Sequence, residues 1–190
     1  MKPPRIITRS EWGARPYRGT CRRLRNIDAL VIHHAAAHYA RTLEDGKAQV
    51  RSIQRFHQHG RRWSDVGYHF LVDGGGHIYQ GRRYEEAKPL EALPKLALGA
   101  HVRRQNSGKI GICVLGCYHP PADNCDDPLS ERSLQAVMRL SAFLCQAYDV
   151  PPARIYGHRD FLRTACPGDV LFRKLAKLRS GAIRAIQSGA

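Results

Sequence analysis

The sequence contains no long apolar run. Apolar residues make up 43% of its 190 residues and charged residues 25%, a balance typical of a soluble globular domain. No segment approaches the roughly 18 consecutive apolar residues of a membrane span. The N-terminal segment Met1–Arg5 is followed by no apolar core of a signal peptide. We therefore expect either synthesis in the cytoplasm or an export segment that has already been removed.

Acidic residues are scarce. The chain has 16 Asp and Glu against 31 Lys and Arg, which gives a formal net charge of +15. Such an excess predicts a polyanionic partner, whether nucleic acid, an anionic membrane face or an envelope polymer. The alternative is a general arginine bias without a specific partner. No recognised nucleic-acid motif and no repeat of aromatic and basic residues is present, so we expect no nucleic acid partner.

Cysteine is also sparse, and none of the six residues forms a C-x-x-C pair, which excludes a dense disulfide scaffold. Cys113 and Cys145 lie within apolar runs, where a thiol packs as a small hydrophobic group. Cys117 and Cys125 flank a loop rich in Pro, Asp and Asn. They could pair in an oxidising compartment, and the sequence leaves that open.

Short apolar runs alternate with segments of helical periodicity, and no internal repeat is present. This alternation predicts an α/β protein: a single domain over residues 1–190, with a central mixed β-sheet flanked by helices. Residues 82–106 are expected to form a loop with a helical turn. The strands are predicted at residues 29–32, 68–72, 77–80, 110–115 and 154–156, and the helices at 42–59, 130–148 and 170–188.

The C-terminal tail, residues 176–190, is basic and helix-prone. An apolar stripe begins before it and runs through it, so a helix there would be amphipathic. The stripe can dock on the rest of the domain, or it can lie on an anionic membrane. Gly181 is expected to break the helix. The stripe consists of Leu171, Leu175, Leu178, Ala182 and Ile186.

Two histidines follow predicted strands. His33 comes after the strand at 29–32 and His158 after the strand at 154–156, and Cys166 lies eight residues further on. Active sites of α/β proteins gather beyond the carboxyl ends of strands. Two imidazoles and one thiolate leave a fourth tetrahedral position free, as a catalytic zinc requires. The alternative is that these are scattered core and surface histidines, because the chain has ten.

Several separate motifs occur in the order found in one protein family. Together they resemble the type-2 N-acetylmuramoyl-L-alanine amidases, which include phage lytic amidases and animal peptidoglycan recognition proteins. The resemblance covers residues 5 to about 175. It rests on Arg9–Pro16, Leu30–His34, Trp63–Phe70, Gly99–His101, Asn106–Ile112 and Gly157–Gly168.

The resemblance implies a fold of the peptidoglycan-recognition and amidase type, with zinc bound by His33, His158 and Cys166. His34 is a neighbour that needs a separate interpretation. Successive strand side chains point to opposite faces, so His33 and His34 do not readily bind one metal ion. We therefore expect His34 to be a packed histidine bonded to the backbone.

The resemblance also implies catalytic and substrate-binding residues. Tyr68 matches the family tyrosine beside the metal, where a phenol can donate to a developing oxyanion. Thr164 lies where some phage members carry lysine, which leaves a neutral donor or a supporting residue. His101 and Asn106 are expected to line the groove and contact the peptide or the sugar.

The implied activity is zinc-dependent hydrolysis of the amide between the muramic acid lactyl group and L-alanine of peptidoglycan. The alternative is a peptidoglycan-binding module without catalysis. The expected partners are peptidoglycan and, through the net charge, anionic envelope polymers or a membrane surface, and we expect a monomer. A phage-type lytic enzyme that reaches the wall after release is the expected setting, with a periplasmic enzyme that has lost its leader as the alternative.

Overall fold

The computed structural model describes residues 1–84, 90 and 94–189. Its centre is one six-stranded sheet with the strand order β1-β4-β3-β5-β2-β6. β3 and β4 pair antiparallel, and all other neighbours pair in parallel, so the predicted mixed sheet is confirmed. The strands are β1 (Ile6–Ile7), β2 (Ile27–His34), β3 (Phe70–Val72), β4 (Ile78–Gln80), β5 (Gly108–Val114) and β6 (Ile155–Gly157).

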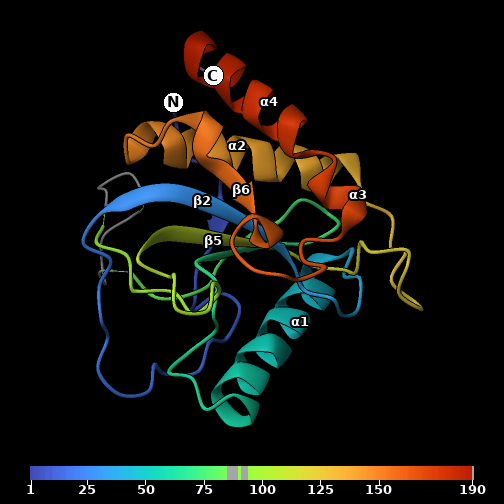
Figure 1. Cartoon of the computed structure of the whole chain (residues 1–190). Helices are drawn as coiled ribbons and strands as arrows, with labels where there is room; N and C mark the ends of the chain where they lie inside the picture. The colour runs from blue at the N-terminus through green and yellow to red at the C-terminus, as the bar shows by residue number, and fades with distance from the viewer. Residues whose placement is uncertain (85–89, 91–93, 190) are drawn as a thin grey trace.

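The long helices cover the two faces of the sheet (Figure 1). α1 (Leu43–Arg55) lies on one face, and α2 (Glu131–Ala147) and α4 (Leu175–Ser188) lie on the other. The side chain of Thr42 caps α1 and that of Ser130 caps α2, each by accepting a backbone N–H, and both residue types are favoured at this position. None of the described helices is long and apolar enough to cross a membrane.

Short elements complete the chain. A π-helical turn, η1 (Phe56–Gly60), continues α1, and α3 (Asp169–Phe172) precedes α4. Two 3₁₀ turns, η3 (Pro152–Arg154) and η4 (His158–Asp160), flank β6. β1 was not predicted, because two residues are too few to show a period. Much of the predicted loop at 82–106 is described, but the part over residues 85–89 and 91–93 lies outside the described residues.

The central strands are buried on both faces, which explains their continuous apolar sequence. In β2, Leu30 and Ile32 join the core beneath α2 and α4. In β5, Cys113 joins a second hydrophobic core on the other face, which includes Trp12 of the N-terminal segment and Val50 of α1. Because side chains alternate along a strand, His33 points to the α1 side and His34 to the opposite side.

The tail docks on the domain, which confirms the first of the two alternatives drawn from its stripe. Leu175, Leu178 and Ala182 are buried in the core between α4 and α2. The predicted break at Gly181 is wrong. α4 continues through this residue because it is buried against Met138 of α2, where a Cβ would collide with the thioether. A glycine in mid-helix permits this close approach of two helices.

Removing the buried part of the Leu178 side chain tests this docking. We expect Leu178→Ala to lower the free energy of unfolding by about 2–5 kcal/mol, the usual cost of deleting a buried leucine. Ile183 of the same helix is 43% exposed, so Ile183→Ala is the matched control and should cost roughly 0.5 kcal/mol or less. Denaturant unfolding of both variants measures the difference. Equal losses would contradict the docked arrangement.

Candidate active site

The predicted ligand residues come together at the carboxyl end of β2. His33 is the penultimate residue of that strand. His158 is the first residue of η4, after β6, and Cys166 lies in the loop that follows η4. One ligand atom from each side chain lies within 4.8 Å of the others. Cys166 Sγ is 3.6 Å from His33 Nδ1. A single ion can therefore contact all three.

The parallel pairing of β2 and β6 brings the two histidines together. In this register Ile32 is the partner of Gly157, so the next residue of each strand emerges at the same edge. The rings of His33 and His158 have their centroids 4.5 Å apart. Residues 125 positions apart in the sequence thus become neighbours because both follow adjacent parallel strands.

His101 lies behind His33 and fixes its tautomer. His101 Nε2 lies 3.2 Å from the carbonyl of Lys109 and donates to it, so its Nδ1 is an acceptor. His33 Nε2 lies 3.0 Å from that Nδ1 and donates to it. The lone pair of His33 is therefore on Nδ1, the atom that faces Cys166. A hydrogen-bond partner of this kind orients metal-binding histidines in proteins.

Burial sets the protonation states of the three side chains. Desolvation, and then the neighbouring His101, holds the pKa of His33 well below its usual range. Desolvation also lowers the pKa of His158. Burial raises the pKa of the Cys166 thiol to about 12. Two neutral imidazoles are ready to bind a cation, whereas the thiol requires a nearby cation to ionise.

One buried nitrogen atom is evidence that this place can bind a metal ion. His158 Nε2 is buried and has no hydrogen-bond partner within the described residues, a costly arrangement for a ring nitrogen. Coordination would satisfy it. Two nitrogens and one sulfur match the ligand preference of zinc, so the residues present fit that ion.

Tyr68 borders the three ligand residues. Its ring centroid is 5.1 Å from that of His33, and its hydroxyl forms a hydrogen bond with the thiol of Cys113. Burial raises the pKa of this phenol well above its usual range, so it stays protonated and is a donor. Cys113 is buried, as predicted, but its contact with Tyr68 could not be inferred from an apolar run alone.

The remaining predicted residues shape the backbone around the site. The hydroxyl of Thr164 accepts the N–H of Cys166 at 3.2 Å. Asn106 Oδ1 accepts the N–H groups of His101 and Val102 at 2.7 and 2.8 Å. His101 is only 6% exposed, and both ring nitrogens are hydrogen-bonded inside the protein. These contacts favour positioning roles for these three residues.

Two further expectations concern the opposite side of β2. His34 Nδ1 accepts the N–H of Tyr118 at 3.2 Å, so His34 is a packed histidine bonded to the backbone, as expected. Cys117 and Cys125 form a disulfide, which answers the question that the sequence left open. This disulfide closes the loop that carries Tyr118.

The sequence did not predict the contacts of Arg159, which connect the segment of His158 with the loop of Cys166. Arg159, next to His158, donates to Asp169 at 2.7 Å and to the carbonyl of Ala165, the residue before Cys166. Its guanidinium also lies 4.8 Å from the ring centroid of Phe172. Arg159 therefore joins η4, the Cys166 loop and α3. The spacing of His158 and Cys166 in the sequence does not reveal such contacts, because they depend on the turn between the segments.

Comparison with known families decides the assignment. A family model described as N-acetylmuramoyl-L-alanine amidase matches residues 23–169, which include all three candidate ligands. The chain belongs to this amidase family. The predicted resemblance and the predicted fold type are therefore confirmed.

Known relatives of this amidase-family domain carry two kinds of name. The chain is 35% identical over 175 residues to the N-acetylmuramoyl-L-alanine amidase of Mus musculus, covering 90% of this chain but 30% of that protein. It is 32% identical over 170 residues to peptidoglycan-recognition protein SC2 of Drosophila melanogaster, covering 90% and 84%. The chain thus spans about a third of the mouse amidase.

A solved structure shares the fold. The human peptidoglycan recognition protein IβC, in complex with glycosamyl muramyl pentapeptide, is similar with a TM-score of 0.76 and 26% identity over 91% of this chain and 95% of that one. The amidase-family fold is therefore shared across nearly the whole of both chains.

The His33–His101 contact gives a testable consequence for this amidase domain. We expect His101→Ala to weaken zinc binding by about 10–100-fold, the usual effect of removing the partner of a metal-binding histidine. Competition with a chromogenic chelator measures the affinity. His59 is exposed and its ring contacts Arg15 and Arg18, so His59→Ala is the control. An unchanged affinity in His101→Ala would show that the contact does not orient His33.

Proposed function

We propose that this domain hydrolyses the amide between the lactyl group of N-acetylmuramic acid and L-alanine in peptidoglycan, with zinc as cofactor. One observation carries the proposal: His33, His158 and Cys166 converge at the carboxyl end of β2 with a protonated phenol, Tyr68, beside them. Three ligands that leave one position open are the arrangement of catalytic zinc.

His33, His158 and Cys166 would hold the ion. When bound, zinc supplies a Lewis acid and lowers the pKa of a bound water to about 7. The hydrogen bonds from His33 to His101 and from His101 to the carbonyl of Lys109 keep the lone pair of His33 on Nδ1, the nitrogen that faces Cys166. A cation held there would favour the thiolate of Cys166, whose pKa is otherwise raised by burial.

The other residues act on the substrate and on the loop. Tyr68 keeps its proton because burial raises its pKa, and it can donate a hydrogen bond to the carbonyl oxygen as that oxygen gains negative charge. Thr164 shapes the turn before Cys166 and can add a neutral donor. Arg159 holds that turn against η4. The chain thereby keeps the donor and the ligands in fixed relative positions.

Peptidoglycan is the substrate class that the relatives support. The human structure holds glycosamyl muramyl pentapeptide, and the mouse relative is named for the same amide. We propose that this chain acts on the cell wall, either after release from a cell or in the periplasm. The disulfide of Cys117 and Cys125 supports action in an oxidising compartment.

A peptidoglycan-binding module without catalysis is the second candidate, because recognition proteins are among the relatives. The complete set of three ligand side chains favours the enzyme. The two functions separate in one assay, in which purified cell wall is incubated with the zinc-loaded protein. New amino termini of L-alanine indicate hydrolysis, and binding of the protein to the wall without them indicates recognition alone.

Each ligand is tested by replacing it singly. His33→Ala, His158→Ala and Cys166→Ala should each lower the bound zinc from about one ion per chain, and each should also lower the release of peptide from cell wall. The reason is that a catalytic zinc site uses three protein ligands and each variant keeps only two of them. Elemental analysis measures the metal. His34→Ala is the matched control and should keep its zinc, because His34 follows His33 in the sequence but faces the other side of β2. Full zinc content in two of the three ligand variants would exclude this assignment.

Tyr68→Phe removes only the phenol hydroxyl. We expect this variant to retain zinc and to lower turnover by roughly 10²–10³, the usual effect of deleting one oxyanion donor. Steady-state assays on a muramoyl-peptide give kcat, and elemental analysis confirms the metal. Turnover near that of the unmodified protein would mean that Tyr68 only packs against His33.

A further inference from the structure

Two stretches of the sequence lack acidic residues, and the fold joins them. Residues 12–27 and 46–64 include ten Lys and Arg but no Asp or Glu. Hydrogen bonds fasten the start of the first stretch along α1 and η1. Gln54 of α1 bonds both the N–H and the carbonyl of Arg15, and the N–H of Arg18 donates to the carbonyl of Ser64. Cations from two distant segments therefore share one surface.

This surface, which we call the arginine surface, lies around the C-terminal end of α1. Arg15 and Arg18 both reach Nε2 of His59, at 2.8 and 3.1 Å, and Arg18 and Arg15 hold the pKa of His59 below its usual range. Arg61 lies over the ring of Phe56, 5.5 Å from its centroid. The exposed side chains of the arginine surface are Arg15, Arg18, Arg51, Arg55, Phe56, His59, Arg61 and Arg62.

The acidic residues closest in sequence do not neutralise these arginines. Asp65 is fully buried and pairs with Arg9 at 2.8 Å, and Glu11 pairs with Arg5 at 2.9 Å. Asp45 lies in the first turn of α1, about 15 Å from the last turn at 1.5 Å per residue. Within the part of the chain that the structure describes, no salt bridge joins an arginine of this surface to an acid.

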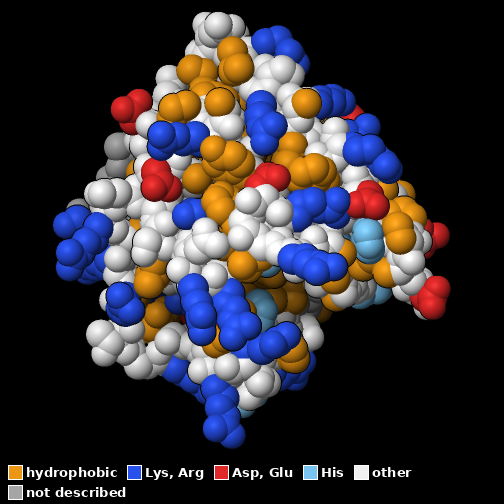
Figure 2. Space-filling model, viewed as in Figure 1, with side chains coloured by type: hydrophobic (Ala, Val, Ile, Leu, Met, Phe, Trp, Pro, Cys, Tyr) orange, Lys and Arg blue, Asp and Glu red, His pale blue; other side chains and the backbone are white. Residues whose placement is uncertain are grey.

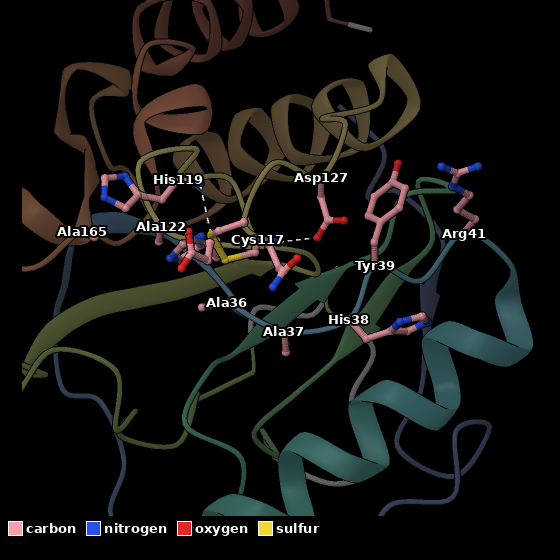
Figure 3. Close-up of a pocket in the computed structure, with 14 residues that line it drawn as sticks. Ala36, Ala37, His38, Tyr39, Arg41, Cys117, His119, Ala122, Asp127 and Ala165 are labelled. Atoms are coloured by element: carbon pink, nitrogen blue, oxygen red, sulfur yellow. Dashed lines mark hydrogen bonds between the residues drawn. A yellow bond between two sulfur atoms is a disulfide. The ribbon is translucent and has the colours of Figure 1, made fainter.

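Figure 2 agrees with this distribution of charge. Lys and Arg side chains gather over the lower part of the molecule, around the C-terminal end of α1, and no described Asp or Glu shows there on this face. The cavity beside the candidate metal centre is different (Figure 3), because its lining combines Arg41, His38 and His119 with Asp123 and Asp127. A polyanion is therefore attracted to the arginine surface more strongly than to that cavity.

Two shallow pockets between the arginines can each take a phosphate group. One, of about 460 Å³, is lined by Arg18 and Arg62, and the other, of about 250 Å³, by Arg15, Arg51 and Arg55. No carboxylate belongs to the described lining of either pocket. A planar guanidinium can donate two parallel hydrogen bonds to a phosphate, which makes arginine well suited to bind this group.

An exposed aromatic ring lies among the arginines. Phe56 is 55% exposed, and Ile183 on the opposite side of the sheet is the other exposed large apolar side chain among the described residues. An aromatic ring surrounded by cations suits the interface of an anionic membrane, where the ring enters the headgroup region and the cations contact phosphates. A single-stranded nucleic acid instead requires a continuous groove with several stacking aromatic rings. Two separate pockets and one exposed ring therefore favour a lipid surface.

We propose that the arginine surface docks on an anionic phospholipid bilayer, with Phe56 in the membrane interface and lipid phosphates in the two pockets. This interaction goes beyond the proposed hydrolysis and does not depend on it. It also differs from membrane binding by the C-terminal tail, because the apolar stripe of the tail is docked in the core.

Vesicle binding by charge variants tests the proposal. The full chain is titrated with vesicles of phosphatidylcholine alone or mixed with phosphatidylglycerol, and cosedimentation gives the affinity. We expect binding to the anionic vesicles that weakens as salt is raised. Arg55→Gln combined with Arg62→Gln should lower this affinity about 30-fold, since each arginine near an anionic surface contributes about 1 kcal/mol. Neither side chain bonds another described residue, so the melting temperature should stay unchanged.

The matched control removes the same charge from the opposite face. Arg139 of α2 and Arg184 of α4 are exposed there, so Arg139→Gln combined with Arg184→Gln should keep the affinity for anionic vesicles. Equal losses in the two double variants would mean that net charge alone attracts the protein, and the proposal would be wrong. No binding to anionic vesicles would also overturn it.

The aromatic ring is tested separately. Phe56→Ala should lower the affinity for anionic vesicles about fivefold through the loss of roughly 1 kcal/mol of apolar burial, whereas Ile183→Ala should leave it unchanged. A single-stranded DNA oligonucleotide distinguishes the other class of polyanion. If the oligonucleotide binds more tightly than the vesicles, and Arg55→Gln with Arg62→Gln abolishes that binding, the arginine surface is a nucleic-acid site and the membrane proposal fails.

Discussion

The site depends on the parallel pairing of β2 with its neighbours. The register that places Ile32 opposite Gly157 makes His33 and His158 leave the sheet at the same point. The pairing of β2 with β5 then matches His33 with Cys113, the thiol that contacts Tyr68. A shift of one residue in β2 would exchange His33 with His34 and turn the ligand to the α2 face.

Neutral histidines fill the space around the ligands. His33, His69 and His101 are almost fully buried, and desolvation lowers the pKa of each. His69 is held by the N–H of Gly111 and the carbonyl of Ala97. The buried guanidinium of Arg82 lies close enough to add to this lowering for His69 and His101. Neutral imidazoles with fixed hydrogen bonds favour a cation bound at one place.

Much of this arrangement was predictable from local patterns. The caps of Thr42 and Ser130, the hairpin of β3 and β4 and the buried strands β2 and β5 follow from periodicity and turn residues. The ligand set followed from motif resemblance, and the spacing of His158 and Cys166 alone would have been weak support for it.

The rest depended on tertiary contacts. The break predicted at Gly181 was wrong because local propensity cannot show that a partner helix fills the space beside it. The interior place of His101 and the clamp of Arg159 were not predictable either, because both depend on the path of a loop. The disulfide of Cys117 and Cys125 required the two loop ends to be close, which composition does not determine.

If the domain binds zinc as proposed, the unpartnered nitrogen of His158 links metal binding to folding. The cost of burying this atom without a hydrogen-bond partner is part of the free energy of the metal-free fold. A ligand that binds only the folded chain adds RT ln(1 + [L]/Kd) to its stability, about 2.7 kcal/mol at a hundredfold excess over Kd. Metal supply would then set the fraction of chains that survive proteolysis, so that the abundance of the domain as well as its activity would follow the zinc content of its surroundings.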